Sequence, residues 1–181
     1  MRLHRDRNPP TEKADDWEDA KVAMQESGSW IKNADTKVTV LAAVLGVSLT
    51  VLAGRFDRIV GALREQGGCL TIFLIVGLAG VVVASITTLI FVAAALRPRT
   101  ARVSEGNRFS WPSMARRPFA PTAFPVASRA SEAWEQAFAL ATIAEAKYRS
   151  FVCALRAFLS LTLWIVVVLV VSAWLGYDSG V

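Results

Sequence analysis

Three long runs without a charged residue constrain this chain more than any other feature. They comprise residues 38–54, 69–96 and 157–177, and none of them contains Asp, Glu, Lys, Arg or His. At about 1.5 Å of rise per helical residue, each run spans or nearly spans a hydrocarbon core about 30 Å thick. We therefore expect an all-α membrane protein with three transmembrane helices.

The composition agrees with this interpretation, because 54% of the 181 residues are hydrophobic and only 19% are charged. A soluble domain normally carries about 25% charged residues. The first run follows thirty-seven residues that contain charges of both signs. A cleaved signal peptide needs a short basic lead, so we interpret the first run as an anchor.

A regular apolar spacing links the first run to the polar segment before it. Residues at alternating steps of three and four predict one helix from about residue 12 to 54, with a single apolar stripe. The stripe consists of Trp17, Ala20, Met24, Ser27, Ile31, Ala34, Val38, Leu41 and Leu45. The helix is expected to begin in the cytoplasm and to end as transmembrane helix 1.

The rest of the chain divides by composition. Five prolines in residues 97–130 exclude a continuous helix there. A second long helix is expected over 131–177, and Trp134, Phe138, Ala141, Tyr148, Val152 and Leu155 share one of its faces with Glu145. The first and third helices would thus extend into a cytoplasmic helical stalk. The remaining expected segments are a disordered leader (1–11), an external hairpin (55–68), transmembrane helix 2 (69–96), a Pro/Arg-rich cytoplasmic linker (97–130) and an external tail (178–181).

Basic residues predict the orientation in the membrane. Lys and Arg number seven in residues 1–37, three in 55–68, ten in 97–156 and none after Tyr177. Because cytoplasmic loops collect Lys and Arg, we expect a cytoplasmic N-terminus and linker and an external C-terminus. The excess of basic residues in 97–156 also favours contact with anionic lipid headgroups.

Small residues recur every four positions on one face of the first run, at Ala42, Gly46, Thr50 and Gly54. Gly80, Ala84 and Thr88 repeat the pattern in the second run. Such stripes let membrane helices approach closely, which predicts helix packing and a homo-oligomer. The alternative is that Gly and Ala are simply common in membrane helices.

Sequence motifs of enzymes are missing from the chain. It contains no Gly-rich phosphate loop, no paired-cysteine motif, no HExxH and no nucleophile elbow. The three runs also lack the charged residues that transporters use for coupling. We expect neither an enzyme nor a transporter, with no cofactor, no metal and no nucleic-acid partner.

Polar residues gather where the helices are expected to enter the membrane. Lys32, Asn33, Asp35 and Lys37 form a collar before the first run, and Glu145, Lys147, Tyr148 and Arg149 precede the third. If the two helices are neighbours, the acids would pair with the bases of the opposite helix. The alternative is a set of anchors that snorkel to the headgroups.

The linker interleaves Arg108, Arg116 and Arg117 with aromatic residues, among them Phe109 and Trp111. Such a segment could bind an anionic, planar ligand by ion pairing and stacking, or lie on the headgroups.

Two of these segments resemble a known family. "NADTKVTVLAAVLGVSLTVL" resembles the ADxKA opening of the transmembrane Pycsar effector family, and "IAEAKYRSFVCALRAFL" is similar to its IAxxKYR segment. The order of spans also agrees, from about residue 17 to 175. Val38 stands where the family usually has Ala. Asp35, Lys37, Ile143, Ala144, Lys147, Tyr148 and Arg149 match the two motifs.

The resemblance implies a membrane effector of antiphage defence in the bacterial inner membrane. A partner pyrimidine nucleotide cyclase would make cyclic UMP or cyclic CMP, with cyclic UMP favoured, and the effector would disrupt the lipid bilayer and cause abortive infection. Our hypothesis for the ligand-binding residues is Lys37, Arg116, Arg117, Lys147, Tyr148 and Arg149. The alternatives are a scaffolding membrane protein whose cytoplasmic coiled coil docks a partner, and a small constitutive channel.

Overall fold

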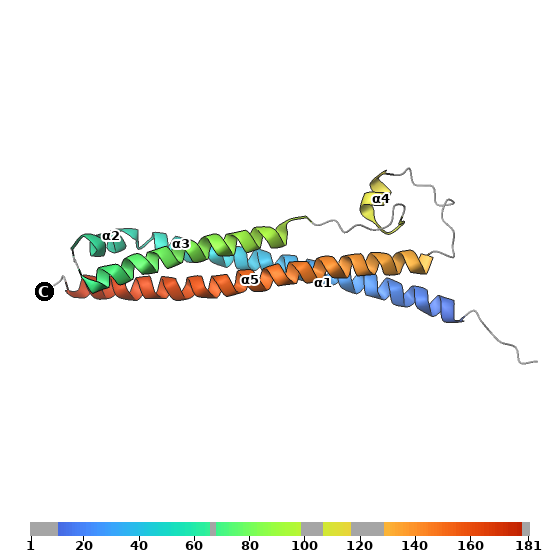
Figure 1. The fold of residues 1–181 in the computed structure, drawn as a ribbon, viewed down its shortest axis with the longest axis horizontal. Helices are drawn as coiled ribbons and strands as arrows, with labels where there is room; N and C mark the ends of the chain where they lie inside the picture. The colour runs from blue at the N-terminus through green and yellow to red at the C-terminus, as the bar shows by residue number, and fades with distance from the viewer. Residues whose placement is uncertain (1–10, 66–67, 99–106, 117–128, 179–181) are drawn as a thin grey trace, which may run out of the picture. The chain divides into compact units, whose positions relative to one another are not determined.

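The regular secondary structure of the described chain is entirely helical. A computed structural model describes residues 11–65, 68–98, 107–116 and 129–178. The helices are α1 (Thr11–Ala53), α2 (Phe56–Glu65), α3 (Cys69–Leu96), α4 (Trp111–Arg116) and α5 (Arg129–Asp178) (Figure 1).

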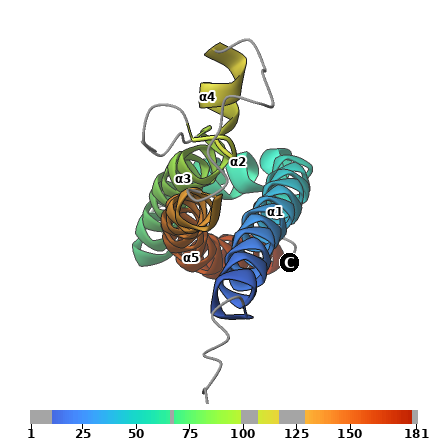
Figure 2. The same cartoon turned by 90° about the vertical axis from the view of Figure 1, so that its right-hand side faces the viewer.

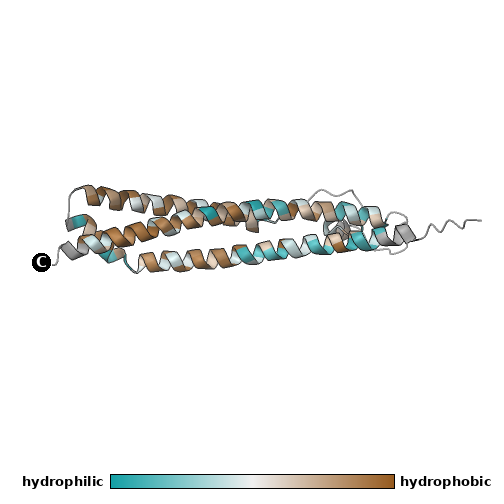
Figure 3. Ribbon diagram, turned by 90° about the horizontal axis from the view of Figure 1, so that it is seen from below, coloured by the Kyte–Doolittle hydropathy of each residue, from teal (hydrophilic) through white to brown (hydrophobic). Residues whose placement is uncertain are grey.

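The chain forms two compact units. Unit 1 comprises Met1–Asn33 and Pro98–Ala146, and unit 2 comprises Ala34–Arg97 and Lys147–Val181. Helices α1 and α5 contribute to both units, whereas α2 and α3 belong to unit 2 and α4 belongs to unit 1. Brown, apolar ribbon dominates α3 and the parts of α1 and α5 in unit 2, and teal is more frequent in unit 1 (Figure 3).

Helix α1 buries the stripe that its spacing predicts. Its buried residues are Ala20, Ala34, Val38, Leu41 and Leu45, all of which belong to that stripe. Steps of three and four keep these side chains on one side of an α-helix. The same spacing of buried residues therefore continues from the polar part of α1 into its apolar part.

Over residues 133–154, helix α5 buries alanines rather than the large side chains that share a face in the sequence. Phe138 is 69% exposed, and Val152 and Leu155 are also exposed, whereas four alanines in this part of the helix are buried. These alanines are Ala133, Ala137, Ala144 and Ala154. Small side chains allow helices to pack at short distance, which suits the buried face of this part of α5. Farther along the helix, the buried face carries the larger Leu161, Ile165 and Val168.

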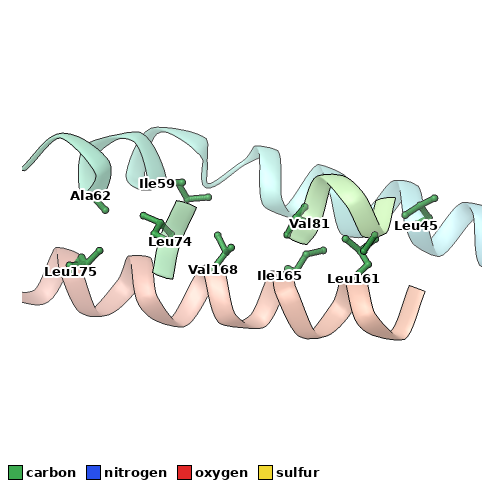
Figure 4. Close-up of a cluster of buried hydrophobic side chains, with 10 residues drawn as sticks. Leu45, Ile59, Ala62, Leu74, Val81, Leu161, Ile165, Val168 and Leu175 are labelled. Carbon is green, nitrogen blue, oxygen red and sulfur yellow. The ribbon is translucent and has the colours of Figure 1, made fainter. Parts of the chain in front are cut away.

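The core of unit 2 contains residues from four helices. One cluster joins Leu45 of α1, Ile59 of α2, Leu74 of α3 and Leu161 of α5, and its side chains are spread along the space between the helices, with Ile59 near Leu74 (Figure 4). A second cluster contains Val38, Leu41, Val92, Ala95 and Ala154. Helices α1, α3 and α5 thus lie side by side in unit 2 (Figure 2).

Two glycines allow α3 to approach α5 closely. A Cβ atom added to Gly80 would lie 2.5 Å from Cδ2 of Trp164, and one added to Gly77 would lie 2.9 Å from Cγ2 of Val168. Real Cβ atoms do not approach other atoms so closely. Gly77 and Gly80 therefore lie on the α3 side of an interface with α5, and Ala84 and Thr88 of the same small-residue stripe are buried.

The stripe of small residues on α1 is mostly exposed, in contrast to the stripe on α3. Ala42 packs at the edge of the second cluster, but Gly46, Thr50 and Gly54 are exposed. No atom outside its own helix lies within 4 Å of a Cβ added to Gly46. Most of this stripe is therefore not used for packing within the described part of the chain.

Unit 2 presents apolar side chains outward on its long helices. Val83 is 65% exposed, Leu163 63% and Val170 62%. Water would not favour such a surface, whereas lipid tails would. The helices α1, α3 and α5 are long and apolar enough to cross a membrane. The chain is accordingly a membrane protein with three candidate spans.

The two short helices lie in segments that the sequence led us to describe as a hairpin and a linker. The buried Ile59 and Ala62 place one face of α2 against the core of unit 2, while Asp57, Arg58 and Arg64 are exposed. Helix α4 accommodates Pro112 as its second residue. Proline is tolerated there because the first turn of a helix leaves its N–H groups without intrahelical partners.

Candidate functional site

Asp35 of α1 and Lys147 of α5 form an ion pair in unit 2. The side chain of Lys147 is 9% exposed and that of Asp35 is 41% exposed. A buried ammonium group needs a partner, because removing it from water costs several kcal/mol. Lys147 lies on the buried face of α5. Asp35 therefore supplies the negative charge that this buried ammonium group needs between the two helices.

Lys37 and Tyr148 add a second contact between the same helices. The Lys37 ammonium donates a hydrogen bond of 3.3 Å to the Tyr148 hydroxyl oxygen. The ammonium lies 5.4 Å from the ring centroid, on the hydroxyl side of the ring. The Tyr148 ring in turn meets Phe151 edge-on, with centroids 6.5 Å apart and an angle of 81°.

We call Asp35, Lys37, Lys147 and Tyr148 the interhelix network. It joins the two segments whose motifs the sequence singled out, and Phe151 connects it to the second core cluster of unit 2. The network contains two cations and one carboxylate, so it carries a net charge of plus one. Chemically it can hold two helices in one register, and Lys37 can also meet an anion.

The other predicted residues have different positions. Lys32 and Asn33 are exposed on α1 within unit 1, and Glu145 and Arg149 are exposed on α5. Arg116 is the last residue of α4, but its side chain and the whole of Arg117 lie outside the described residues. The structure thus brings together Lys37, Lys147 and Tyr148 of the predicted ligand-binding set, with Asp35 of the predicted collar.

A second cluster of specific contacts lies in unit 1, in the segment Asn107–Ser110, which we call the clasp. Asn107 is 2% exposed, and its side-chain amide donates to the Glu132 carbonyl oxygen at 2.8 Å and to the Glu135 carboxylate at 3.2 Å. Its side-chain oxygen accepts a hydrogen bond from the backbone N–H of Phe109 at 2.9 Å. These bonds fix the clasp to the start of α5.

Arg108 of the clasp surrounds one carboxylate with donors. Its Nε and backbone N–H donate to Oε2 of Glu132 at 3.0 Å and 3.1 Å, and its Nη2 donates to Oε1 at 3.2 Å. Both side chains are 18% exposed. Glu132 lies in the first turn of α5, where the helix dipole favours an acid.

Aromatic stacking connects the clasp to α1. The Phe109 ring stacks on Trp17 with centroids 5.7 Å apart and an angle of 30°. The Arg129 guanidinium carbon lies 3.7 Å from the centre of the Trp17 ring. The Trp134 indole N–H also donates to Asp16 at 2.9 Å. Trp17 is therefore covered by one planar ring and one planar cation.

Sequence reasoning missed the partners in the clasp. It singled out Arg108 and Phe109 as groups for a ligand, whereas both already have partners inside the chain. A sequence signal existed in Asn107, since an Asn side chain often bonds to a backbone N–H two residues later. Nothing in the sequence pointed to Glu132 or Trp17 as the partners.

Metal-ligating side chains do not gather in the described ranges, where no group of three or more His, Cys, Asp or Glu residues is placed to hold an ion.

The model of the Pycsar effector protein domain matches residues 19–175 and so covers most of the chain. This chain belongs to the Pycsar effector family. Comparison with curated proteins and with solved structures found no match. Membership implies an effector role in Pycsar antiphage defence, in which a partner cyclase supplies a cyclic nucleotide signal. Both segments of the interhelix network lie within the matched region.

Proposed function

We propose that this Pycsar effector responds directly to a cyclic pyrimidine nucleotide and then disrupts the bacterial inner membrane, which causes abortive infection. Cyclic UMP is the favoured signal and cyclic CMP the second. Family membership supports the effector role, and three apolar helices support action at a membrane. The observation that carries the proposal is the interhelix network, which connects α1 and α5 through a buried cation.

The interhelix network could distinguish two packings of α1 against α5. A ligand shifts an equilibrium only when it binds one packing of the helices better than the other. Breaking the contact between Asp35 and Lys147 exposes the cation to water or to a new anion, so the two packings differ in charge exposure. Lys37 and Arg149, both exposed, add positive charge near this position.

Assembly of several copies supplies the membrane damage in this proposal. The exposed Gly46, Thr50 and Gly54 give α1 a face of small residues that another membrane helix can approach closely. Helix packing of this kind does not need a hydrophobic driving force, which is absent between helices in lipid. A homo-oligomer that forms through this face is our proposed active state.

We further propose that the N-terminus and unit 1 lie in the cytoplasm, as a helical stalk, and that α2 and the C-terminus lie outside. The basic excess in residues 97–156 supports this orientation. It puts the basic segment 97–156 on the side where a cyclase acts. It also puts α2, with its charged face, at the outer headgroups.

Co-expression with a pyrimidine nucleotide cyclase tests the proposal. We expect cells that contain both proteins to admit a membrane-impermeant dye, and cells with the effector and a catalytically inactive cyclase to exclude it. Absence of dye entry, with both proteins present, would contradict the effector function and favour a scaffolding role. Dye entry without an active cyclase would instead indicate a constitutive channel.

A further inference from the structure

The clasp makes an ion pair and an aromatic stack through two adjacent residues, Arg108 and Phe109. Its Arg108 directs three N–H donors to the Glu132 carboxylate, and the adjacent Phe109 presents a planar ring to the Trp17 indole. A carboxylate and a phosphodiester each offer two oxygens to the fork of an arginine. Aromatic side chains likewise stack on one another and on nucleobases.

We propose that the clasp is a nucleotide site occupied by the protein's own side chains. In the closed form, Glu132 takes the place of a cyclic phosphate on Arg108, and Phe109 takes the place of a pyrimidine ring on Trp17. A cyclic pyrimidine nucleotide carries both groups, one negative charge and one planar base. It therefore opens the clasp by replacing both contacts. This inference rests on the proposed function, because it assumes that the chain senses the nucleotide directly.

The surroundings allow such an exchange. The Arg108 and Glu132 side chains are each 18% exposed, so the pair lies near the surface and the displaced carboxylate can reach water. Arg129 is exposed and already lies over the Trp17 ring. It provides a second cation beside the aromatic platform. Asn107, in contrast, is 2% exposed and stays bonded to α5, so the segment keeps an anchor.

The two contacts of the clasp each join one occupant of the proposed site to one receptor. Glu132 and Phe109 are occupants that compete with the nucleotide, whereas Arg108 and Trp17 receive it. Only the open clasp can bind the nucleotide, so the apparent affinity equals the intrinsic affinity multiplied by the fraction of molecules that are open. Weakening an occupant therefore raises affinity, and removing a receptor lowers it. If the ion pair has only a structural role, substitution of either partner should change nucleotide affinity in the same direction.

The test is calorimetric binding of cyclic UMP and of cyclic CMP to the full chain in detergent micelles. We expect Glu132→Gln to tighten binding by about tenfold and Arg108→Gln to weaken it by about tenfold or more, although they break the same ion pair. Phe109→Ala is expected to tighten binding and Trp17→Ala to weaken it. Glu18→Gln, which removes an exposed ion pair with Lys21 in the same unit, is the matched control and should change nothing.

Far-ultraviolet circular dichroism establishes that each variant keeps its helices. If Arg108→Gln loses helix content, Arg108→Lys is measured in its place. Lysine keeps the positive charge but lacks the paired N–H donors of the guanidinium group. Affinity changes of the same sign in both partners of the pair, or no change in either, overturn the inference while leaving direct sensing intact. If the unaltered protein binds neither nucleotide, direct sensing itself is wrong and this inference falls with it.

Discussion

The buried ammonium group of Lys147 on α5 donates a hydrogen bond to the carboxylate of Asp35 on α1, so a charged contact joins these two helices. The pair belongs to unit 2, next to the fully buried Val38. Its two members are not equivalent, because the lysine is buried and the aspartate is partly exposed.

This asymmetry predicts unequal effects of substitution. Asp35→Asn leaves a buried cation without its anion and should destabilise the protein by about 1–3 kcal/mol, reduced from the fully buried case by the exposure of Asp35. Lys147→Met fills the space with an apolar side chain and should cost less than about 1 kcal/mol. Thermal unfolding in detergent, with the double variant to complete the cycle, measures both. Equal costs would contradict the asymmetry.

Gly80 and Gly46 form a matched pair for a test of helix packing. Gly80→Ala should destabilise the fold by about 1–3 kcal/mol, because the new Cβ would collide with the Trp164 indole. Gly46→Ala meets no atom and should leave stability unchanged or raise it by up to about 1 kcal/mol. Unfolding in detergent distinguishes the two. A stable Gly80→Ala variant would argue against the close approach of α3 and α5.

The exposed face of α1 makes a separate prediction about assembly. Gly46→Leu should reduce crosslinking between copies in membranes that contain cyclic UMP, since a large side chain keeps helices apart. Val83→Leu, on an exposed face of α3, is the control and should crosslink as the unaltered protein does. Unchanged crosslinking of Gly46→Leu would exclude this face as the contact between copies.

The native cysteines report the orientation in the membrane. Cys69 is exposed at the start of α3, and Cys153 is half-buried in α5. With the proposed orientation, a membrane-impermeant maleimide added to intact cells should label the protein, and Cys69→Ser should abolish the labelling. Labelling that survives Cys69→Ser and disappears in Cys153→Ser would reverse the orientation.

Asn107 is predicted to hold the clasp to α5. Asn107→Ala removes the donors to Glu132 and Glu135 and the acceptor for the Phe109 N–H. Hydrogen exchange of the peptide that covers residues 107–116 should accelerate by about tenfold, while Asn33→Ala, at an exposed position of α1, should leave it unchanged. An unchanged exchange rate in Asn107→Ala would show that the clasp is held by other contacts.

The sequence allowed α1 to be predicted in detail, because its buried residues repeat at a fixed spacing. The same approach misleads for α5, where size draws attention to Phe138 and Val152 although the buried face is lined by Ala137 and Ala154. Periodicity shows which residues share a face of a helix, but it does not show which face packs against a neighbouring helix. Close packing of helices depends on small side chains, and that choice is made only when two helices meet.

The candidate site was predictable in part. Complementary charges on the two helices indicated a pairing, but the partner of Asp35 depends on the register between α1 and α5, which a single sequence does not contain. The contacts of the clasp were beyond sequence reasoning. Glu132 and Trp17 lie 24 and 92 positions from the residues that they bind, Arg108 and Phe109.

The most direct measurement of the central claim is release of a dye from lipid vesicles that contain the purified protein. We predict that cyclic UMP releases the dye, that cyclic CMP does so less effectively, and that linear UMP, which has the same base without the cyclic phosphate, does not. Vesicles that stay intact with both cyclic nucleotides, or that leak equally with linear UMP, would contradict the account.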